Sequence, residues 1–116
     1  MKQREYVDYV QDILTSIDDI KEFIKGQDFE SFLKDKKTKN AVIRSIEVIA
    51  EAAKYIPASI KNNDPDIPWT KIKGMRNKMI HEYFGIDEEI LWKVAVEDIP
   101  PLRQKIKKIL DKLNKL

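Results

Sequence analysis

The sequence has no cysteine and only one histidine, His81, among its 116 residues. The lack of cysteine excludes a disulfide scaffold and thiolate chemistry, and a single histidine excludes a His/Cys zinc cluster within one chain. Long apolar runs are missing too, since none approaches the ~20 residues that a transmembrane helix needs. The polar start, MKQREYVDYVQD, lacks the apolar centre of a signal peptide. We therefore expect a cytoplasmic protein that does not contact membranes.

What remains is a composition typical of a globular protein. Hydrophobic residues make up 42% of the chain and charged residues 36%. The length suits one hydrophobic core that needs no metal or disulfide to hold it together. We expect residues 1–116 to form a single domain.

The net charge is only +2, but it is unevenly distributed along the chain. Residues 34–44, 61–78 and 101–116 have net charges of +4, +3 and +5, whereas residues 1–33 and 79–100 have −4 and −5. A basic patch formed by such segments would attract phosphates in a salt-dependent way. Lysines on the outer face of an amphipathic helix are also commonly just solvated, so charge alone does not establish a nucleic-acid surface.

Apolar residues recur at alternating spacings of four and three, which is the period of an amphipathic helix. This pattern predicts a helix over about 6–24, a more deeply buried helix over about 37–56, and a last helix opened by Asp98 and Pro100-Pro101. We expect Gly26 and Pro57 to end the first two. The three stripes are Tyr6, Val10, Ile13, Ile17, Ile20 and Ile24; Val42, Ile46, Ile49, Ala53 and Ile56; and Leu102, Ile106, Ile109 and Leu113.

The segments between these helices carry turn and cap signals. Asp28 can cap a short helical turn, and the proline-rich 57–68 is interpreted as the main loop. Pro68 suits the first turn of a helix that runs to a C-terminal stop at Gly85, and Asp87 can cap the next segment. No alternation typical of strands is present. We predict an all-α, up-and-down bundle of about four long helices and one or two short ones.

The stretch GMRNKMIHEYFG gathers Arg76, Asn77, His81 and Tyr83 within eight positions of the expected helix. At about 100° per residue, Arg76 and His81 lie about 140° apart with Asn77 between them. Such an arc can line a cleft but cannot close one. A two-fold dimer would supply the second wall by presenting a second copy of the stretch.

The chemistry of these side chains suits phosphates. The planar guanidinium of Arg76 can bind a phosphate through two hydrogen bonds, and His81 can exchange protons near neutral pH. Asn77 can hydrogen-bond an oxygen or fix the imidazole. Together they suit attack by an RNA 2′-hydroxyl on the adjacent phosphate, which needs no metal ion. A lone histidine on a helix is, however, usually structural or exposed.

Arg76-Asn77, His81 and Tyr83 together resemble the R-x4-H-x-Y signature of the HEPN superfamily, and more narrowly the HepT toxins of toxin–antitoxin pairs. The resemblance covers nearly the whole chain, including AVIRSIEVIAEAAKYIP, IPWTKIKGMRNKMIHEY and LWKVAVEDIPPLRQKI. One small departure is Ala50, where many relatives are expected to have glycine. This is a difference in packing and leaves the chemistry intact.

The resemblance implies a helical bundle that forms a homodimer, with the two motifs meeting in a cleft at the interface. It implies a metal-independent endoribonuclease without a cofactor, in which Arg76 and His81 are catalytic and Asn77 supports them. It further implies a minimal nucleotidyltransferase antitoxin as partner, which transfers AMP from ATP onto Tyr83. An adenylyl group beside the cleft would add bulk and negative charge where an RNA phosphate must lie.

Two other functions are consistent with the sequence. The first is a non-catalytic HEPN module that binds a nucleotide or supports a nucleotidyltransferase, and the second is a plain helical dimerisation protein. The intact trio of Arg76, Asn77 and His81 favours catalysis, because a scaffold has no need of it. Trp69 and Trp92 could stack RNA bases, although tryptophans at such helical positions are more commonly core or interface residues. Lys73 and Lys78 could steer RNA or be merely solvated.

Overall fold

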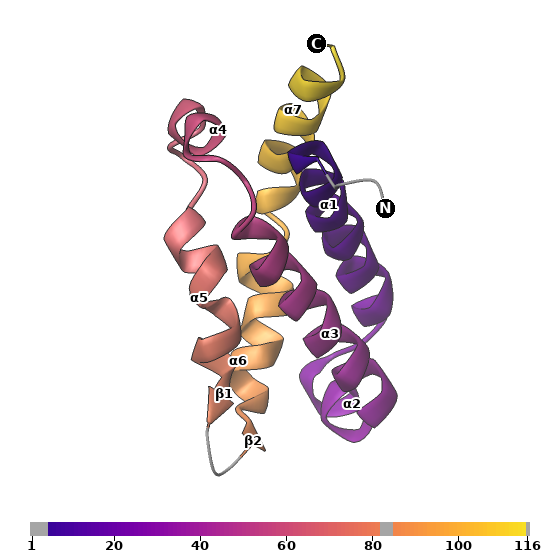
Figure 1. The fold of residues 1–116 in the computed structure, drawn as a ribbon. Helices are drawn as coiled ribbons and strands as arrows, with labels where there is room; N and C mark the ends of the chain where they lie inside the picture. The colour runs from indigo at the N-terminus through magenta and orange to yellow at the C-terminus, as the bar shows by residue number, and fades with distance from the viewer. Residues whose placement is uncertain (1–4, 82–84, 116) are drawn as a thin grey trace, which may run out of the picture.

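The computed structural model describes residues 5–81 and 85–115. Within these ranges the chain forms seven α-helices, one π-helical turn and one two-stranded antiparallel ribbon (Figure 1). The elements are α1 (Tyr6–Ile24), α2 (Phe29–Lys34), α3 (Lys36–Ala53), α4 (Ala58–Asn63), α5 (Trp69–Met79), β1 (Ile80–His81), β2 (Gly85–Ile86), α6 (Glu88–Lys93), η1 (Val94–Asp98) and α7 (Leu102–Asn114). None of the described helices is both long and apolar enough to cross a membrane.

The four longest helices, α1, α3, α5 and α7, form the main bundle, which confirms the predicted all-α class. Helix α1 packs against α3 and α7, and α3 also packs against α5. The predicted stripes supply the core, because their central residues are almost completely buried. These are Val10, Ile13, Ile17 and Ile20 on α1, Val42, Ile46, Ile49 and Ala53 on α3, and Leu102, Ile106 and Ile109 on α7.

Helix caps and a glycine set several of the boundaries. The Asp28 carboxylate accepts a hydrogen bond from the Ser31 amide at 2.8 Å, and Asp87 accepts one from the Ile90 amide at 3.1 Å. Both confirm the predicted caps of α2 and α6. Gly26 follows α1 with a φ of +77°, a conformation that glycine adopts at no steric cost, so the chain turns there as expected.

The structure differs from the sequence prediction between α3 and α5. Helix α3 ends at Ala53, and Pro57 serves as the N-cap residue of α4 instead of ending α3. The segment interpreted as a loop therefore contains a third short helix beside α2 and α6. Near the other end, α7 begins at Leu102, and Asp98 belongs to η1 without capping α7.

The ribbon lies at one end of the molecule, and the start of α1 and the end of α7 lie toward the other (Figure 1). Helix α5 runs down to β1, the chain returns through β2, and α6 runs back alongside α5 (Figure 1). The stretch with the candidate site residues is therefore placed at the ribbon end.

Candidate active site

Arg76 and Asn77 lie in the last turn of α5, and both are exposed. The same helix buries Ile72, Met75 and Met79 against the bundle. Because these apolar residues recur every three or four positions, they occupy one side of the helix and leave the other side to the polar residues. The core contacts of α5 thus fix Arg76 and Asn77 in an outward orientation.

The helix does not continue to His81 as the sequence predicted. It ends at Met79, and His81 lies in the two-residue strand β1, where it pairs with Gly85. The predicted angle of about 140° between Arg76 and His81 is wrong, because it assumes one continuous helix. The structure describes the backbone of His81 but not its side chain, and Tyr83 lies outside the described residues.

Contacts on both sides hold the ribbon in place. The Asp87 amide donates a hydrogen bond to the Met79 carbonyl at 2.8 Å, and Ile80 pairs with Ile86. Gly85, with a φ of +79°, pairs with His81, so it is part of the ribbon and not the end of α5 that the sequence predicted. The site backbone is therefore attached both to α5 and to the start of α6.

The start of α6 is in turn tied to the first turn of α3. The Lys39 ammonium lies 2.8 Å from a Glu88 carboxylate oxygen and also donates a hydrogen bond to the Leu33 carbonyl at 2.8 Å. Lys39 is mostly buried, so its ion pair is less screened by water than an exposed one would be. This contact fixes α6, and through it the ribbon, relative to the bundle.

The exposed side of α5 is positively charged. Lys73, Arg76 and Lys78 are all exposed, and no carboxylate of residues 5–81 or 85–115 forms an ion pair with any of them. In the same part of the chain, no cluster of three or more His, Asp or Glu residues is placed to hold a metal ion. These three cations therefore lie on the exposed side of α5.

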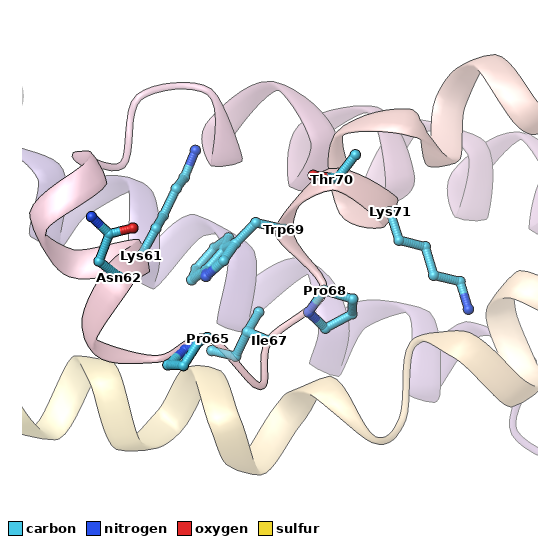
Figure 2. Close-up of a pocket in the computed structure, with 8 residues that line it drawn as sticks. All are labelled: Lys61, Asn62, Pro65, Ile67, Pro68, Trp69, Thr70 and Lys71. Carbon is cyan, nitrogen blue, oxygen red and sulfur yellow. The ribbon is translucent and has the colours of Figure 1, made fainter.

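A groove that the sequence alone did not reveal lies at the other end of α5. It is lined by Lys61 and Asn62 of α4, by Pro65 and by residues 67–71 around Trp69, and its volume is about 800 Å³ (Figure 2). The basic character of 61–78 and the tryptophan were its only sequence signals. Trp92, by contrast, packs on Phe32 with ring centres 4.9 Å apart, so it belongs to the core margin.

Comparison with known proteins gives a consistent result. The family model described as "Ribonuclease HepT-like" matches residues 13–109. "Probable ribonuclease HepT" of Thermococcus cleftensis is 49% identical over 107 residues, which cover 92% of this chain and 97% of that protein. "Putative RNase MJ0125" of Methanocaldococcus jannaschii is 42% identical over 113 residues, which cover 97% of each chain. No solved structure gives a significant match.

Proposed function

Because the chain belongs to the HepT-like ribonuclease family, we propose that it is a metal-independent endoribonuclease whose site contains Arg76, Asn77 and His81. One observation carries the assignment of residues. Arg76 and Asn77 are exposed on the last turn of α5, directly before the strand that contains His81. The guanidinium of Arg76, the amide of Asn77 and the imidazole of His81 thus belong to one short segment whose backbone is attached to α5 and α6.

In the proposed reaction, the RNA 2′-oxygen forms a bond to the adjacent phosphorus as the bond from phosphorus to the 5′-oxygen breaks. The imidazole of His81 takes the 2′-hydroxyl proton or returns one to the leaving 5′-oxygen. The Arg76 guanidinium stabilises the negative charge that develops on the phosphoryl oxygens. Asn77 supports Arg76 and His81 by donating a hydrogen bond to an oxygen or by orienting the imidazole. The products are a 2′,3′-cyclic phosphate and a 5′-hydroxyl.

The reaction benefits from both a general acid and a general base, but one chain has a single histidine. We therefore propose a two-fold homodimer in which two copies of the motif face one cleft. Such an interface is self-complementary, so each copy supplies the wall that the other lacks. One histidine would then act as base while the other acts as acid.

We further propose that the protein is the toxin of a toxin–antitoxin pair, with a minimal nucleotidyltransferase as its antitoxin. The proposed silencing reaction is AMPylation: the Tyr83 hydroxyl attacks the α-phosphorus of ATP, so that AMP is transferred and pyrophosphate leaves. The added phosphodiester places bulk and negative charge two residues from His81. RNA phosphates would be excluded by contact and by repulsion.

The test is cleavage of RNA in EDTA by purified protein without an adduct on Tyr83. Parent protein should cut, whereas Arg76→Ala and His81→Ala should each lose about 100-fold or more in rate. Lys107→Ala is a matched control, because Lys107 is an exposed cation on α7 whose partner is Asp111. A single 2′-deoxyribose at the mapped cleavage position should block the cut.

Two results would overturn the proposal. Cleavage that survives the 2′-deoxy substitution would exclude 2′-hydroxyl attack. Equal inactivity of parent and variants, with no adduct detected by mass spectrometry, would favour a non-catalytic module that binds a nucleotide or supports a nucleotidyltransferase.

A further inference from the structure

The exposed side of α5 connects the groove at its first residue to the candidate active site at its last turn. Trp69, Lys73 and Arg76 follow one another at spacings of four and three, so they lie along one side of the helix. From Trp69 to Arg76 the axial distance is about 10 Å, at about 1.5 Å per residue. That is about three steps of a stacked nucleic-acid strand at about 3.4 Å each.

The groove beside Trp69 combines an apolar floor with a polar rim. Pro65, Ile67 and Pro68 lie around the partly buried Trp69 ring, and Lys61 and Asn62 come from α4 (Figure 2). The Lys61 ammonium lies over the Trp69 ring, 5.6 Å from its centre. An aromatic surface with a cation next to it is the arrangement that proteins use to hold single-stranded nucleic acid.

The positive charge of the groove is only partly neutralised. Lys71 lies 3.5 Å from an Asp98 carboxylate oxygen, so it already has a counter-ion. Lys61 and Lys73 form no ion pair with any carboxylate in the described ranges. Burial lowers the pKa of Lys61, and the positive charge of Lys73 lowers it further. A phosphate placed between them would relieve this repulsion.

We propose that the groove beside Trp69 is a binding site for single-stranded RNA, about three nucleotides from the scissile phosphate. A base stacks on the Trp69 ring in place of the Lys61 ammonium that lies over it, and Lys61 then joins Lys73 in binding the phosphates that lead toward Arg76. This inference rests on the proposed function, because it takes Arg76 as the point where the phosphate is cut. It adds that the substrate is unpaired on one side of the cut.

Binding should be measured with a mixed-sequence, 2′-O-methyl oligoribonucleotide of 12 nucleotides, which lacks the attacking hydroxyl and stays intact. Trp69→Ala should weaken binding about 5- to 100-fold, whereas Trp69→Phe, which keeps an aromatic ring, should stay within about threefold of the parent. A plot of the log of the association constant against log salt concentration has a negative slope, and each single-strand phosphate contact contributes about 0.7 to its magnitude. Lys61→Ala/Lys73→Ala should therefore make the slope shallower by about 1.4. Lys107→Ala should leave the slope unchanged.

Fluorescence provides a test that does not depend on Trp69→Ala folding. In Trp92→Phe, Trp69 is the only tryptophan, and the oligonucleotide should quench its emission. In Trp69→Phe, Trp92 remains against Phe32, and its emission should not change. Equal quenching of both variants, or none in Trp92→Phe, would overturn the proposal.

The oligomeric state of each variant must be compared by light scattering. A loss of binding that occurs only together with a change in oligomeric state would assign the groove to a protein interface and overturn the RNA site. The assay requires no cleavage, so an inactive protein that still binds through Trp69 would refute the catalytic proposal alone. A protein that cuts RNA but binds equally well without Trp69, Lys61 and Lys73 would refute this site alone.

Discussion

The amide of Asp87 donates a hydrogen bond to the carbonyl of Met79 across 2.8 Å, joining the last residue of α5 to the N-cap of α6. The chain between them leaves the helix and returns within eight residues. His81 is paired with Gly85 inside this excursion. The backbone position of His81 is therefore set by the ribbon and not by the rotation of a helix.

Substitution of Gly85 should lower the cleavage rate as well as the stability of the fold. Its φ of +79° is in the left-handed region, and a Cβ there would meet nothing within 4 Å, so Gly85→Ala introduces backbone strain without a clash. We expect a loss of about 1–2 kcal/mol of unfolding free energy and a lower cleavage rate. Denaturant melts and initial rates on RNA measure the two effects.

Gly26 offers a matched control for this substitution. It has nearly the same φ, +77°, and equally open surroundings, but it lies between α1 and α2. Gly26→Ala should cost similar stability and leave the cleavage rate unchanged. Equal rate losses in the two variants would show that strain acts on the whole fold and that the ribbon has no special role.

If the proposed dimer shares one cleft, an inactive subunit should lower the cleavage activity of the active subunit paired with it. When excess Arg76→Ala/His81→Ala protein is mixed with parent and subunits exchange, activity per parent chain should fall below that of parent at the same dilution. The reason is that a shared cleft then has only one intact motif. Rates that depend on parent concentration alone would show that each chain has a complete site.

Tyr83→Phe should keep cleavage but escape silencing. The substitution removes the hydroxyl that would attack ATP, so incubation with the partner nucleotidyltransferase and ATP should add no AMP and leave the rate unchanged. Tyr55→Phe is a fitting control, because Tyr55 is 54% exposed and should not affect modification. Intact-mass spectrometry measures the adduct. An AMP adduct on the Tyr83→Phe protein would show that a residue other than Tyr83 is modified.

We expect the stability of the fold to depend on pH through Asp35, the N-cap residue of α3. Hydrogen bonds from the Thr38 hydroxyl, at 2.6 Å, and from the Thr38 amide lower the pKa of Asp35 below its usual 3.8. Since the pKa is lower in the folded state, this stabilisation is complete above about pH 4 and is lost as pH falls through the folded-state value. The protein should therefore melt at lower temperature in acid.

A pair of variants isolates the contribution of the Thr38 side chain. Thr38→Val removes the hydroxyl hydrogen bond to Asp35, whereas Thr38→Ser keeps it. Thr38→Ser should melt higher than Thr38→Val at pH 7, and the gap should shrink toward pH 2, as measured by circular dichroism. A gap that stays constant over this range would assign the difference to the side-chain methyl groups instead.

The helices that the sequence predicted best are those with long, regular apolar stripes. The stripes that include Ile13 on α1 and Ile46 on α3 continue along one face for about three turns or more, so the local pattern and the final burial agree. Helix α4 was missed for the opposite reason. It has only six residues, and its flanking Pro57 and Asp64 look like loop signals although they bound a helix.

The site residues were predicted by type and spacing, but their arrangement was not. Apolar periodicity continues from Met75 through Met79 to Ile80, so nothing local marks the end of α5. The end is set by pairing with Gly85 and by the Asp87 amide, which are contacts across a turn. The groove beside Trp69 was likewise hidden, because Lys61 reaches it from a different helix.

The first helix begins and the last helix ends at the opposite end of the bundle from the ribbon (Figure 1). An affinity tag, a fluorophore or a surface tether that precedes α1 or follows α7 would therefore join the bundle at the end opposite to the last turn of α5, which carries Arg76. Immobilised protein would present the ribbon end to solution. An attachment on that side therefore suits the cleavage assay. Binding at the groove beside Trp69 is better measured with untethered protein, because Asp64, which accepts a hydrogen bond from the Trp69 indole, lies 3.6 Å from Lys112 near the end of α7.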